Sequence, residues 1–303
     1  MFRKNYSKYA LLFFSFCLLL TGCQTDSSTQ TKQDSATSTE ISANTKDTNL
    51  KGSITVIENF NSPQLKTDFT LRIYLPYGYE ESTSAYPVIY MQDGQNLFSS
   101  ETASYGKEWG IDETLDGLYT QEKTDGIIVV GVDSHDDTRN KDYNLFLSPQ
   151  NGSTKGNANL YADFLTDTLK PYIDENYRTL SDREHTAIIG SSYGAISSIC
   201  TDILHPDVFG FAGLFSYCDN LNPDQMTKYL EENMTPAVLD DTYLYFYAGS
   251  SDFAFSSTNA AYQLALDNGM EHVLYETDDG SHDELSWGPH VEECLDFFGW
   301  LKQ

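Results

Sequence analysis

Apolar strings separated by helical patterns constrain the fold of this chain more than any other feature. Residues 87–94 (PVIYMQDG), 126–133 (GIIVVGVD) and 186–190 (TAIIG) are apolar almost throughout. Residues 210–218 and 242–249 are of the same kind, and residues 54–60, 70–76 and 271–277 also have the pattern of strands. Unbroken apolar strands alternating with helices are typical of a parallel sheet that helices cover on both faces. We therefore predict an α/β fold with a mostly parallel, eight-stranded sheet whose first two strands are antiparallel.

Helical spacing occurs between these strings. After Gly194 the apolar side chains fall on one face of a helix, and Pro206 ends it by disfavouring helix in the residue before it. The opposite, polar face of this helix carries Ser197, Ser198, Thr201 and Asp202. Further helices are predicted at residues 111–119, 159–177, 259–269 and 291–301.

The first residues have the pattern of a secretory signal. Three basic residues precede a short apolar run, and the sequence Leu-Thr-Gly-Cys ends at Cys23. The run is shorter than the roughly 20 apolar residues that span a bilayer. Its last four residues are similar to the bacterial lipobox, in which the cysteine receives a diacylglycerol. We predict a lipoprotein signal at residues 1–22 and lipid attachment at Cys23; the alternative is plain secretion with an incidental cysteine.

Residues 23–51 are polar and cannot bury enough apolar surface to offset their ordering entropy. We expect a disordered linker there, followed by one domain over residues 52–303 that is held on the extracellular side of a bacterial membrane. The net charge of −27 becomes −30 without the signal, which carries three positive charges and no acids. This charge excludes nucleic acid as a partner, because phosphate binding needs clustered cations. The membrane is therefore expected as a partner through the lipid anchor only.

Residues 190–194, Gly-Ser-Ser-Tyr-Gly, match the pattern G-x-S-x-G with Ser192 at its centre. A buried strand precedes the pattern and an amphipathic helix follows it, which is the context of a nucleophile elbow. The helix N-terminus would direct N–H groups and partial positive charge toward a developing oxyanion. We predict that Ser192 is a nucleophile, with an ordinary strand–helix turn as the alternative. One oxyanion donor should be the N–H of Tyr193, and another should come from the loop after residues 87–94.

A serine nucleophile needs a base, and the base needs a carboxylate to orient it. On a nucleophile elbow the chain order is serine, acid, histidine. His282 lies in the loop after the last strand and is the predicted base, with His290 in reserve. Asp252 follows residues 242–249 and is the predicted acid, although it could instead cap a helix. The acids close to His282 in sequence compete for this role: Asp278, Asp279 and Asp283.

Two other groups of residues have several interpretations. Three cysteines lie in the domain, and their apolar surroundings predict buried side chains, with a disulfide left open: Cys200, Cys218 and Cys294. Residues 132–143 gather Asp133, His135, Asp136 and Asp137. We interpret these as solvated side chains rather than a metal site, and Arg139 in the same segment either anchors the loop or contacts substrate.

Six motifs, spread in order over about residues 54–301, resemble the putative-esterase family of α/β-hydrolases. They are YPVIYMQDGQNLF (86–98), EWGIDETLDGL (108–118), IIVVGVD (127–133), GSSYGA (190–195), AGSSDF (248–253) and GSHDELSW (280–287). This family includes enterochelin-esterase-like enzymes, feruloyl and acetyl-xylan esterases, S-formylglutathione hydrolase and the antigen-85 mycolyltransferases. The usual Gly-Gly-His before the base reads Gly-Ser-His here, ending at His282.

The resemblance implies an α/β-hydrolase fold and a triad of Ser192, Asp252 and His282. It also implies that Gln95 lends its N–H to the oxyanion and that Trp109 lies near the acyl pocket. We expect a serine esterase that forms an acyl-enzyme on a small-molecule or carbohydrate ester, without metal or cofactor. The alternatives are acyl transfer to a sugar or glycan by the same triad, and a catalytically inert binding lipoprotein.

Overall fold

The computed structural model describes residues 50–149 and 154–303 of the 303-residue chain. The predicted signal at residues 1–22, Cys23 and the predicted linker up to residue 49 lie outside the described residues. No helix within the described residues is both long enough and apolar enough to cross a membrane.

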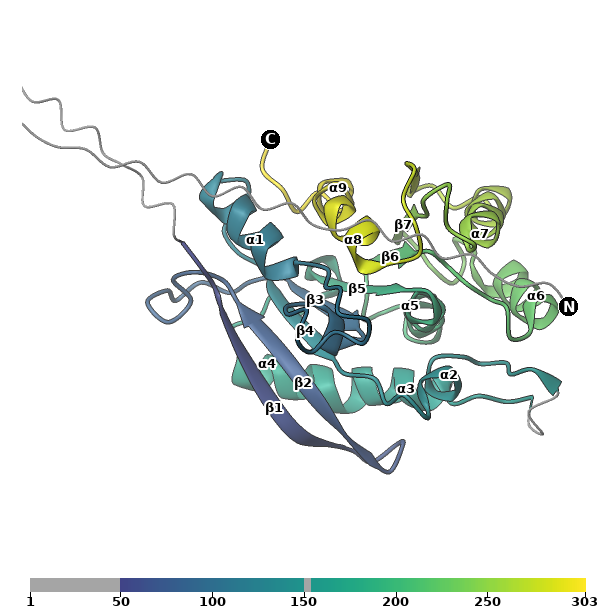
Figure 1. Ribbon diagram of the computed structural model, residues 1–303, viewed down its shortest axis with the longest axis horizontal. Helices are drawn as coiled ribbons and strands as arrows, with labels where there is room; N and C mark the ends of the chain where they lie inside the picture. The colour runs from purple at the N-terminus through teal and green to yellow at the C-terminus, as the bar shows by residue number, and fades with distance from the viewer. Residues whose placement is uncertain (1–49, 150–153) are drawn as a thin grey trace, which may run out of the picture. The chain divides into compact units, whose positions relative to one another are not determined.

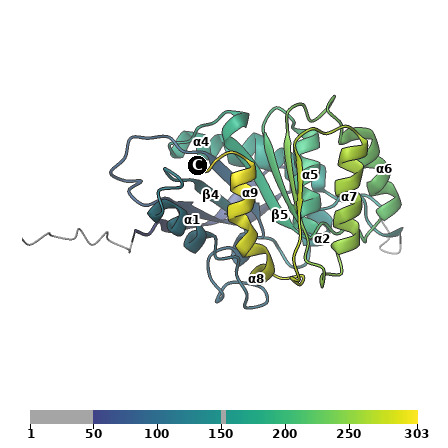
Figure 2. The same ribbon diagram turned by 90° about the horizontal axis from the view of Figure 1, so that it is seen from above.

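An eight-stranded sheet runs through the described chain (Figures 1 and 2). Its strands are β1 (Ser53–Ser62), β2 (Thr67–Leu75), β3 (Val88–Gln92), β4 (Ile128–Val132), β5 (Thr186–Ser191), β6 (Phe211–Phe215), β7 (Tyr243–Tyr247) and β8 (Val273–Glu276). The spatial order is β1-β2-β4-β3-β5-β6-β7-β8. Strand β2 is antiparallel to both of its neighbours, and every pairing from β4 to β8 is parallel. The predicted strands and the predicted mostly parallel sheet are confirmed.

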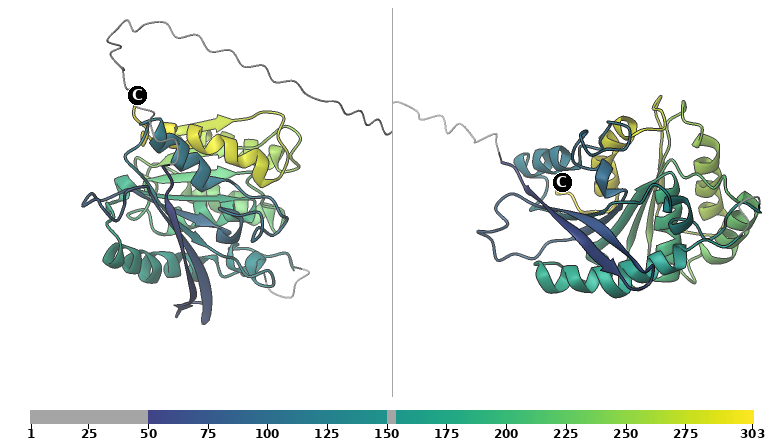
Figure 3. Two further views of the ribbon diagram at one scale, coloured as in Figure 1. Left: turned by 60° about the vertical axis from the view of Figure 1, so that its left-hand side comes forward. Right: turned by 60° about the horizontal axis from the view of Figure 1, so that its bottom comes forward.

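Helices cover both faces of this sheet (Figures 2 and 3). They are α1 (Ile111–Thr120), α2 (Arg139–Asp142), α3 (Ala158–Phe164), α4 (Lys170–Asn176), α5 (Tyr193–Leu204), α6 (Pro223–Asn233), α7 (Phe255–Asp267), α8 (Glu284–Trp287) and α9 (Val291–Phe297). Short 3₁₀ turns include η1 (Gly94–Asn96) and η5 (Gly288–His290). Helices α1 and α9 contribute to one core, and α3, α4, α5 and α7 contribute to the other.

Alternate residues of the buried strands supply the two cores. In β3, Val88 and Tyr90 pack into the core that contains α5, whereas Ile89 and Met91 pack into the core that contains α1 and α9. Side chains of a strand alternate between its faces, so a strand buried on both faces must be apolar at every position. This alternation explains why the sequence shows unbroken apolar strings.

The predicted helix over residues 159–177 is interrupted by a π-helical turn, η3 (Leu165–Leu169). The hydroxyl of Thr166 donates to the carbonyl of Ala162, at 3.0 Å. Pro171 follows in the first turn of α4 and has no N–H to donate to the preceding turn. These two residues perturb the ordinary hydrogen-bond ladder at the point where the wider turn occurs.

Helix α6 was not predicted from the sequence.

Helix α5 is buried on the face that the sequence pattern marks as polar. Ser197, Ser198, Thr201 and Asp202 are at most 1% exposed, because α5 packs between the sheet and α3. Neither carboxylate oxygen of Asp202 has a hydrogen-bond partner within the described residues. The polar face of the predicted amphipathic helix is therefore buried as well, since the sheet covers one side of α5 and α3 covers another.

Burial makes the stability of the fold depend on the ionisation of Asp202. Desolvation raises the pKa of this carboxyl to about 8, although Arg183 opposes the shift. The unfolded chain would release this proton near pH 4. The folded state therefore holds the proton through this interval, and the free energy of unfolding falls as the pH rises from about 4 to about 8.

We predict that Asp202→Asn stabilises the protein at pH 8 by a few kcal/mol and removes this part of the pH dependence. Urea unfolding at pH 5 and pH 8 measures both effects. Asp207→Asn is the matched control, because Asp207 is exposed in the loop after α5. An Asp202→Asn protein with the wild-type slope of stability against pH would contradict the prediction.

Candidate active site

The carboxyl ends of the parallel strands lie level with one another. Ser191, the last residue of β5, is opposite Phe215 of β6, which is opposite Tyr247 of β7, which is opposite Glu276 of β8. Each of these residues ends its strand. The segments that follow the strands therefore begin at one edge of the sheet, where open α/β sheets bind their ligands.

Ser192 lies on a strained turn between β5 and α5. Its backbone angles are φ 57° and ψ −121°, and its N–H donates to the carbonyl of Phe215 at 2.9 Å. A non-glycine residue in such a conformation costs on the order of 1–3 kcal/mol and is typical of functional sites. A Cβ atom on Gly190 would lie 2.5 Å from the backbone of Gly194. The structure thus has the predicted elbow geometry, and its small residues are required by close packing.

The predicted acid and base are in direct contact. Nδ1 of His282 lies 2.8 Å from Oδ1 of Asp252. Two backbone hydrogen bonds hold their loops together, from Ser250 to Asp278 at 2.8 Å and from Ser251 to Gly280 at 3.1 Å. These bonds therefore hold the Asp252 carboxylate, in the loop after β7, beside His282 in the loop after β8.

The close approach of these two loops requires a residue without a side chain. A Cβ atom on Gly249 would lie 2.1 Å from the carbonyl oxygen of Gly280. Gly249 precedes Asp252 by three residues, and Gly280 precedes His282 by two. The glycines thus let the acid and the base meet.

Three donors surround the buried carboxylate of Asp252. Besides His282, the hydroxyl of Ser216 donates to Oδ2 at 2.5 Å and the N–H of Ala254 donates to Oδ1 at 2.7 Å. Burial alone would raise the pKa of Asp252, but the hydrogen bonds from His282, Ser216 and Ala254 outweigh it and hold the pKa below its ordinary value. The indole N–H of Trp287 in turn donates to the Ser216 hydroxyl at 2.7 Å.

Sequence reasoning missed Ser216 and assigned no role to Trp287. Ser216 lies inside the predicted string 210–218, directly after the end of β6, and its backbone has φ 49°. Trp287 is the last residue of the motif GSHDELSW. A serine near the end of a buried string was the available signal, but the contact of Ser216 with Asp252 in another loop could not be read from the sequence.

The other candidate residues are engaged elsewhere. His290 stacks on Tyr247 with ring centroids 3.9 Å apart, and its nitrogens face Glu293 at 2.6 Å and Asp278 at 3.3 Å. Asp283 pairs with Lys107 at 2.8 Å. The reserve base and these competing acids therefore lie outside the contact between Asp252 and His282.

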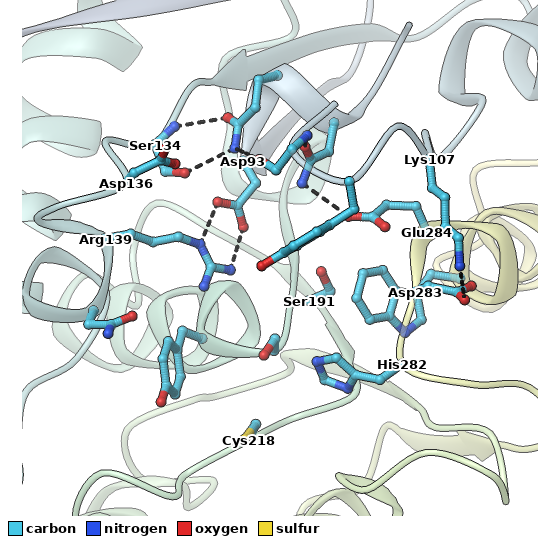
Figure 4. A pocket seen from close by; sticks show the side chains of 18 of the residues that line it. Asp93, Lys107, Ser134, Asp136, Arg139, Ser191, Cys218, His282, Asp283 and Glu284 are labelled. Carbon is cyan, nitrogen blue, oxygen red and sulfur yellow. Dashed lines mark hydrogen bonds and ion pairs between the residues drawn. The ribbon is translucent and has the colours of Figure 1, made fainter. Parts of the chain in front are cut away.

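A pocket of about 830 Å³ opens at this edge of the sheet (Figure 4). Four of the predicted site residues line it: Ser192, Tyr193, Gln95 and His282. Asp252 lies behind His282 and is 5% exposed. Ser192 and His282 line the same pocket, and within the described residues no hydrogen bond joins them.

Trp109 does not line this pocket. Its ring is buried 5.5 Å from that of Trp287 and 4.9 Å from that of Phe215, centroid to centroid. Trp287, whose ring packs against that of Trp109, does line the pocket. Trp109 therefore lies next to a residue of the pocket wall but not in that wall, and its place near an acyl pocket stays a prediction.

The loop after β3 carries Gln95 in η1. The side-chain amide of Gln95 donates to the Ser134 hydroxyl and accepts from the Ser134 N–H, both at 3.0 Å. The residue before η1, Asp93, has left-handed backbone angles and is 4% exposed. Arg139 binds both of its oxygens, at 2.6 and 2.7 Å (Figure 4). Arg139 thus anchors the loop after β3, which is one of its two interpretations, and it also lines the pocket. Contact of Arg139 with substrate stays a prediction.

The acidic and histidine side chains of the segment after β4 have separate partners and do not form one cluster. Asp133 binds Arg72 through two bonds of 2.8 and 2.9 Å, and His135 packs on the ring of Phe69. In the described part of the chain, no group of three or more histidine, cysteine, aspartate or glutamate side chains could hold a metal. The three described cysteines are free and buried, and Cys218 lines the pocket.

Together, the strand order and the elbow define an α/β-hydrolase fold. The model of the Putative esterase family matches residues 62–290, and the chain belongs to this family. A solved ferulic acid esterase superposes with a TM-score of 0.66 at 22% identity, covering 82% of this chain and 98% of that one. This superposition shows that the two proteins share a fold.

Two curated relatives match about half of this chain. Uncharacterized protein YbbA of Bacillus subtilis is 26% identical over 152 residues, which are 49% of this chain and 55% of YbbA. An endo-1,4-beta-xylanase/feruloyl esterase of Xylanibacter ruminicola is 31% identical over 152 residues, covering 48% of this chain and 19% of that protein. The match thus spans only part of each relative.

We predict that the ion pair of Asp93 and Arg139 stabilises the fold. Arg139→Gln leaves the Asp93 carboxylate buried without its partner and should cost about 3 kcal/mol of unfolding free energy. Adding Asp93→Asn should recover part of this loss, because it removes the unpaired charge. Urea unfolding of both single variants and the double variant measures the coupling.

Lys228→Gln is the matched control. It breaks the exposed pair of Lys228 with Glu232, 3.8 Å apart, and should change stability by about 0.5 kcal/mol or less. Equal effects of Arg139→Gln and Lys228→Gln would contradict the prediction.

Proposed function

We propose that the protein hydrolyses carboxylic esters through an acyl-enzyme formed on Ser192. The observation that carries the proposal is the 2.8 Å contact between His282 Nδ1 and Asp252 Oδ1 beside the pocket that Ser192 lines. A serine on a strained elbow, an imidazole and a buried carboxylate are the three groups that nucleophilic acyl transfer requires.

In this mechanism the Ser192 hydroxyl attacks the ester carbonyl carbon while Nε2 of His282 takes its proton. The imidazolium then gives that proton to the leaving alcohol as the carbon–oxygen bond breaks. Water attacks the acyl-enzyme by the same route, and the proton returns to Oγ of Ser192. Asp252 accepts from Nδ1–H throughout, which fixes the tautomer and stabilises the imidazolium. The missing bond from Ser192 to His282 forms when substrate binds, since such contacts are often long in free enzymes.

The N–H groups of Tyr193 and Gln95 are the proposed oxyanion donors. Within the described residues neither N–H donates to a protein acceptor, and both residues line the pocket. Tyr193 begins α5, so the positive end of the helix dipole adds to its N–H. Loss of one such donor costs roughly 3–4 kcal/mol of transition-state stabilisation.

We propose a small-molecule or carbohydrate ester as the substrate. Tyr105 and Phe253 border the pocket with rings that are 84% and 70% exposed. Exposed aromatic rings offer flat apolar surfaces to a ligand. The solved neighbour named as a ferulic acid esterase favours the same class.

We predict that Ser192→Ala and His282→Ala each abolish hydrolysis of p-nitrophenyl acetate, with the melting temperature changed by only a few degrees. A fluorophosphonate probe should label the wild-type protein at Ser192. His290→Ala is the control, because His290 is the reserve base and is bound to other acids. Loss of turnover in His290→Ala with activity retained in His282→Ala would overturn the assignment.

We also propose that the protein is lipid-anchored on the extracytoplasmic side of a bacterial membrane. The support is the sequence motif that ends at Cys23, behind a short apolar run. Cys23→Ala should abolish incorporation of an alkyne fatty acid and release the protein from the membrane fraction. Esterase activity should persist in the released protein, and membrane retention without label would contradict the anchor.

A further inference from the structure

Both cations that line the pocket are already paired. Arg139 binds both oxygens of Asp93, and its guanidinium also lies between the rings of Tyr143 and Tyr193, 5.1 and 5.7 Å from their centroids. Lys107 Nζ lies 2.8 Å from Asp283 Oδ2. Figure 4 shows these pairs on opposite sides of the cavity. Each pair has no net charge, so neither cation offers a free positive charge to a ligand.

Two further acids line the pocket without a cationic partner in the described part of the chain: Asp136 and Glu284. Asp136 is exposed in the segment after β4. Glu284 is 5% exposed at the start of α8, and its Oε1 accepts from Nδ2 of Asn96 at 3.0 Å. An amide donor binds this carboxylate without neutralising it. The formal charges of the side chains that line the pocket sum to −2, from four acids and two cations. Burial raises the pKa of Glu284 above its ordinary value, although the positive charge of Lys107 opposes this shift.

The field of the whole molecule has the same sign. The chain carries a net charge of −27 and has a pI of about 4.3. A field of this sign slows the approach of anions and speeds that of cations, and salt screens it over about 8 Å at physiological ionic strength. The electrostatic field of the whole molecule and the charges that line the pocket therefore both disfavour anionic ligands.

We propose that the pocket selects esters that are uncharged or cationic near the scissile bond and rejects anionic ones, with Asp136 and Glu284 as specificity-determining residues. The proposal rests on the hydrolase function proposed above. An anionic substrate would meet two like charges and no free cation. At separations of about 5–8 Å and a dielectric between those of protein and water, this repulsion disfavours the anion on the order of tenfold.

The test uses three p-nitrophenyl esters of similar length and shape: the neutral 5,5-dimethylhexanoate, the anionic 4-sulfobutyrate and the cationic 4-(trimethylammonio)butyrate. Their kcat/KM values are measured at low salt with the full-length protein and divided by their rates of hydroxide hydrolysis. We expect the corrected anionic-to-neutral ratio to be about 0.1 or lower and the cationic-to-neutral ratio to be at least 1. Raising NaCl to about 0.5 M should increase the first ratio.

Variants that remove the charges of Asp136 and Glu284 test whether these residues cause the rejection of the anionic ester. Asp136→Asn combined with Glu284→Gln should raise the anionic-to-neutral ratio about tenfold. Asp137→Asn is the matched control, because it removes the same charge from the same segment at an exposed residue that does not line the pocket. It should leave the ratio within twofold. Equal turnover of the anionic ester, or a ratio that the double variant does not move, overturns the proposal.

Failure of the hydrolase function has a different signature: none of the three esters is turned over, and a fluorophosphonate does not label Ser192. Binding of the same esters, followed by NMR titration, then tests the charge preference directly. Weaker binding of the anionic ester that recovers in the double variant supports the preference. Equal or tighter binding of the anionic ester refutes it.

Discussion

Parallel hydrogen bonding in register between β5, β6, β7 and β8 is the constraint on which the rest of the site depends. The pairing makes the four strands end level, at Ser191, Phe215, Tyr247 and Glu276. A slip of one residue in any of these strands would turn its side chains to the opposite core. The two apolar cores therefore fix the register, and the register fixes where the elbow, the acid and the base begin.

The strained backbone at this edge of the sheet is held in place by the buried strands that precede it. Ser192 and Ser216 both have positive φ, and each follows a strand whose side chains are buried on both faces. Their N–H groups extend the ladders of the sheet, from Ser192 to Phe215 at 2.9 Å and from Ser216 to Tyr247 at 2.6 Å. The sheet thus continues to hold the backbone through the residues where the chain turns. Rigid positioning of this kind is what preorganised catalytic groups need.

The sequence was sufficient for the parts of the site that depend on chain order. The sequence pattern located all eight strands, and the segments that follow three of them carry Ser192, Asp252 and His282. Contacts between side chains of distant loops were not predictable in this way. The bond from Trp287 to Ser216 depends on how α8 lies over the end of β6, and the same packing places Trp109 beside Trp287. Periodicity also did not show that Asp202 is buried, because it cannot tell a solvated helix face from a second buried one.

The charges of the pocket and the proposed oxyanion donors have a common consequence. Arg139 and Lys107 are neutralised by Asp93 and Asp283, so negative charge developing on a carbonyl oxygen meets no free cation there. Backbone N–H groups remain as the means of stabilisation, and they are dipoles whose effect falls off over a short distance. Such a site stabilises a small charge at one fixed atom better than a permanent charge elsewhere on a ligand. The same arrangement that suits an ester transition state is therefore expected to discriminate against anionic substrates.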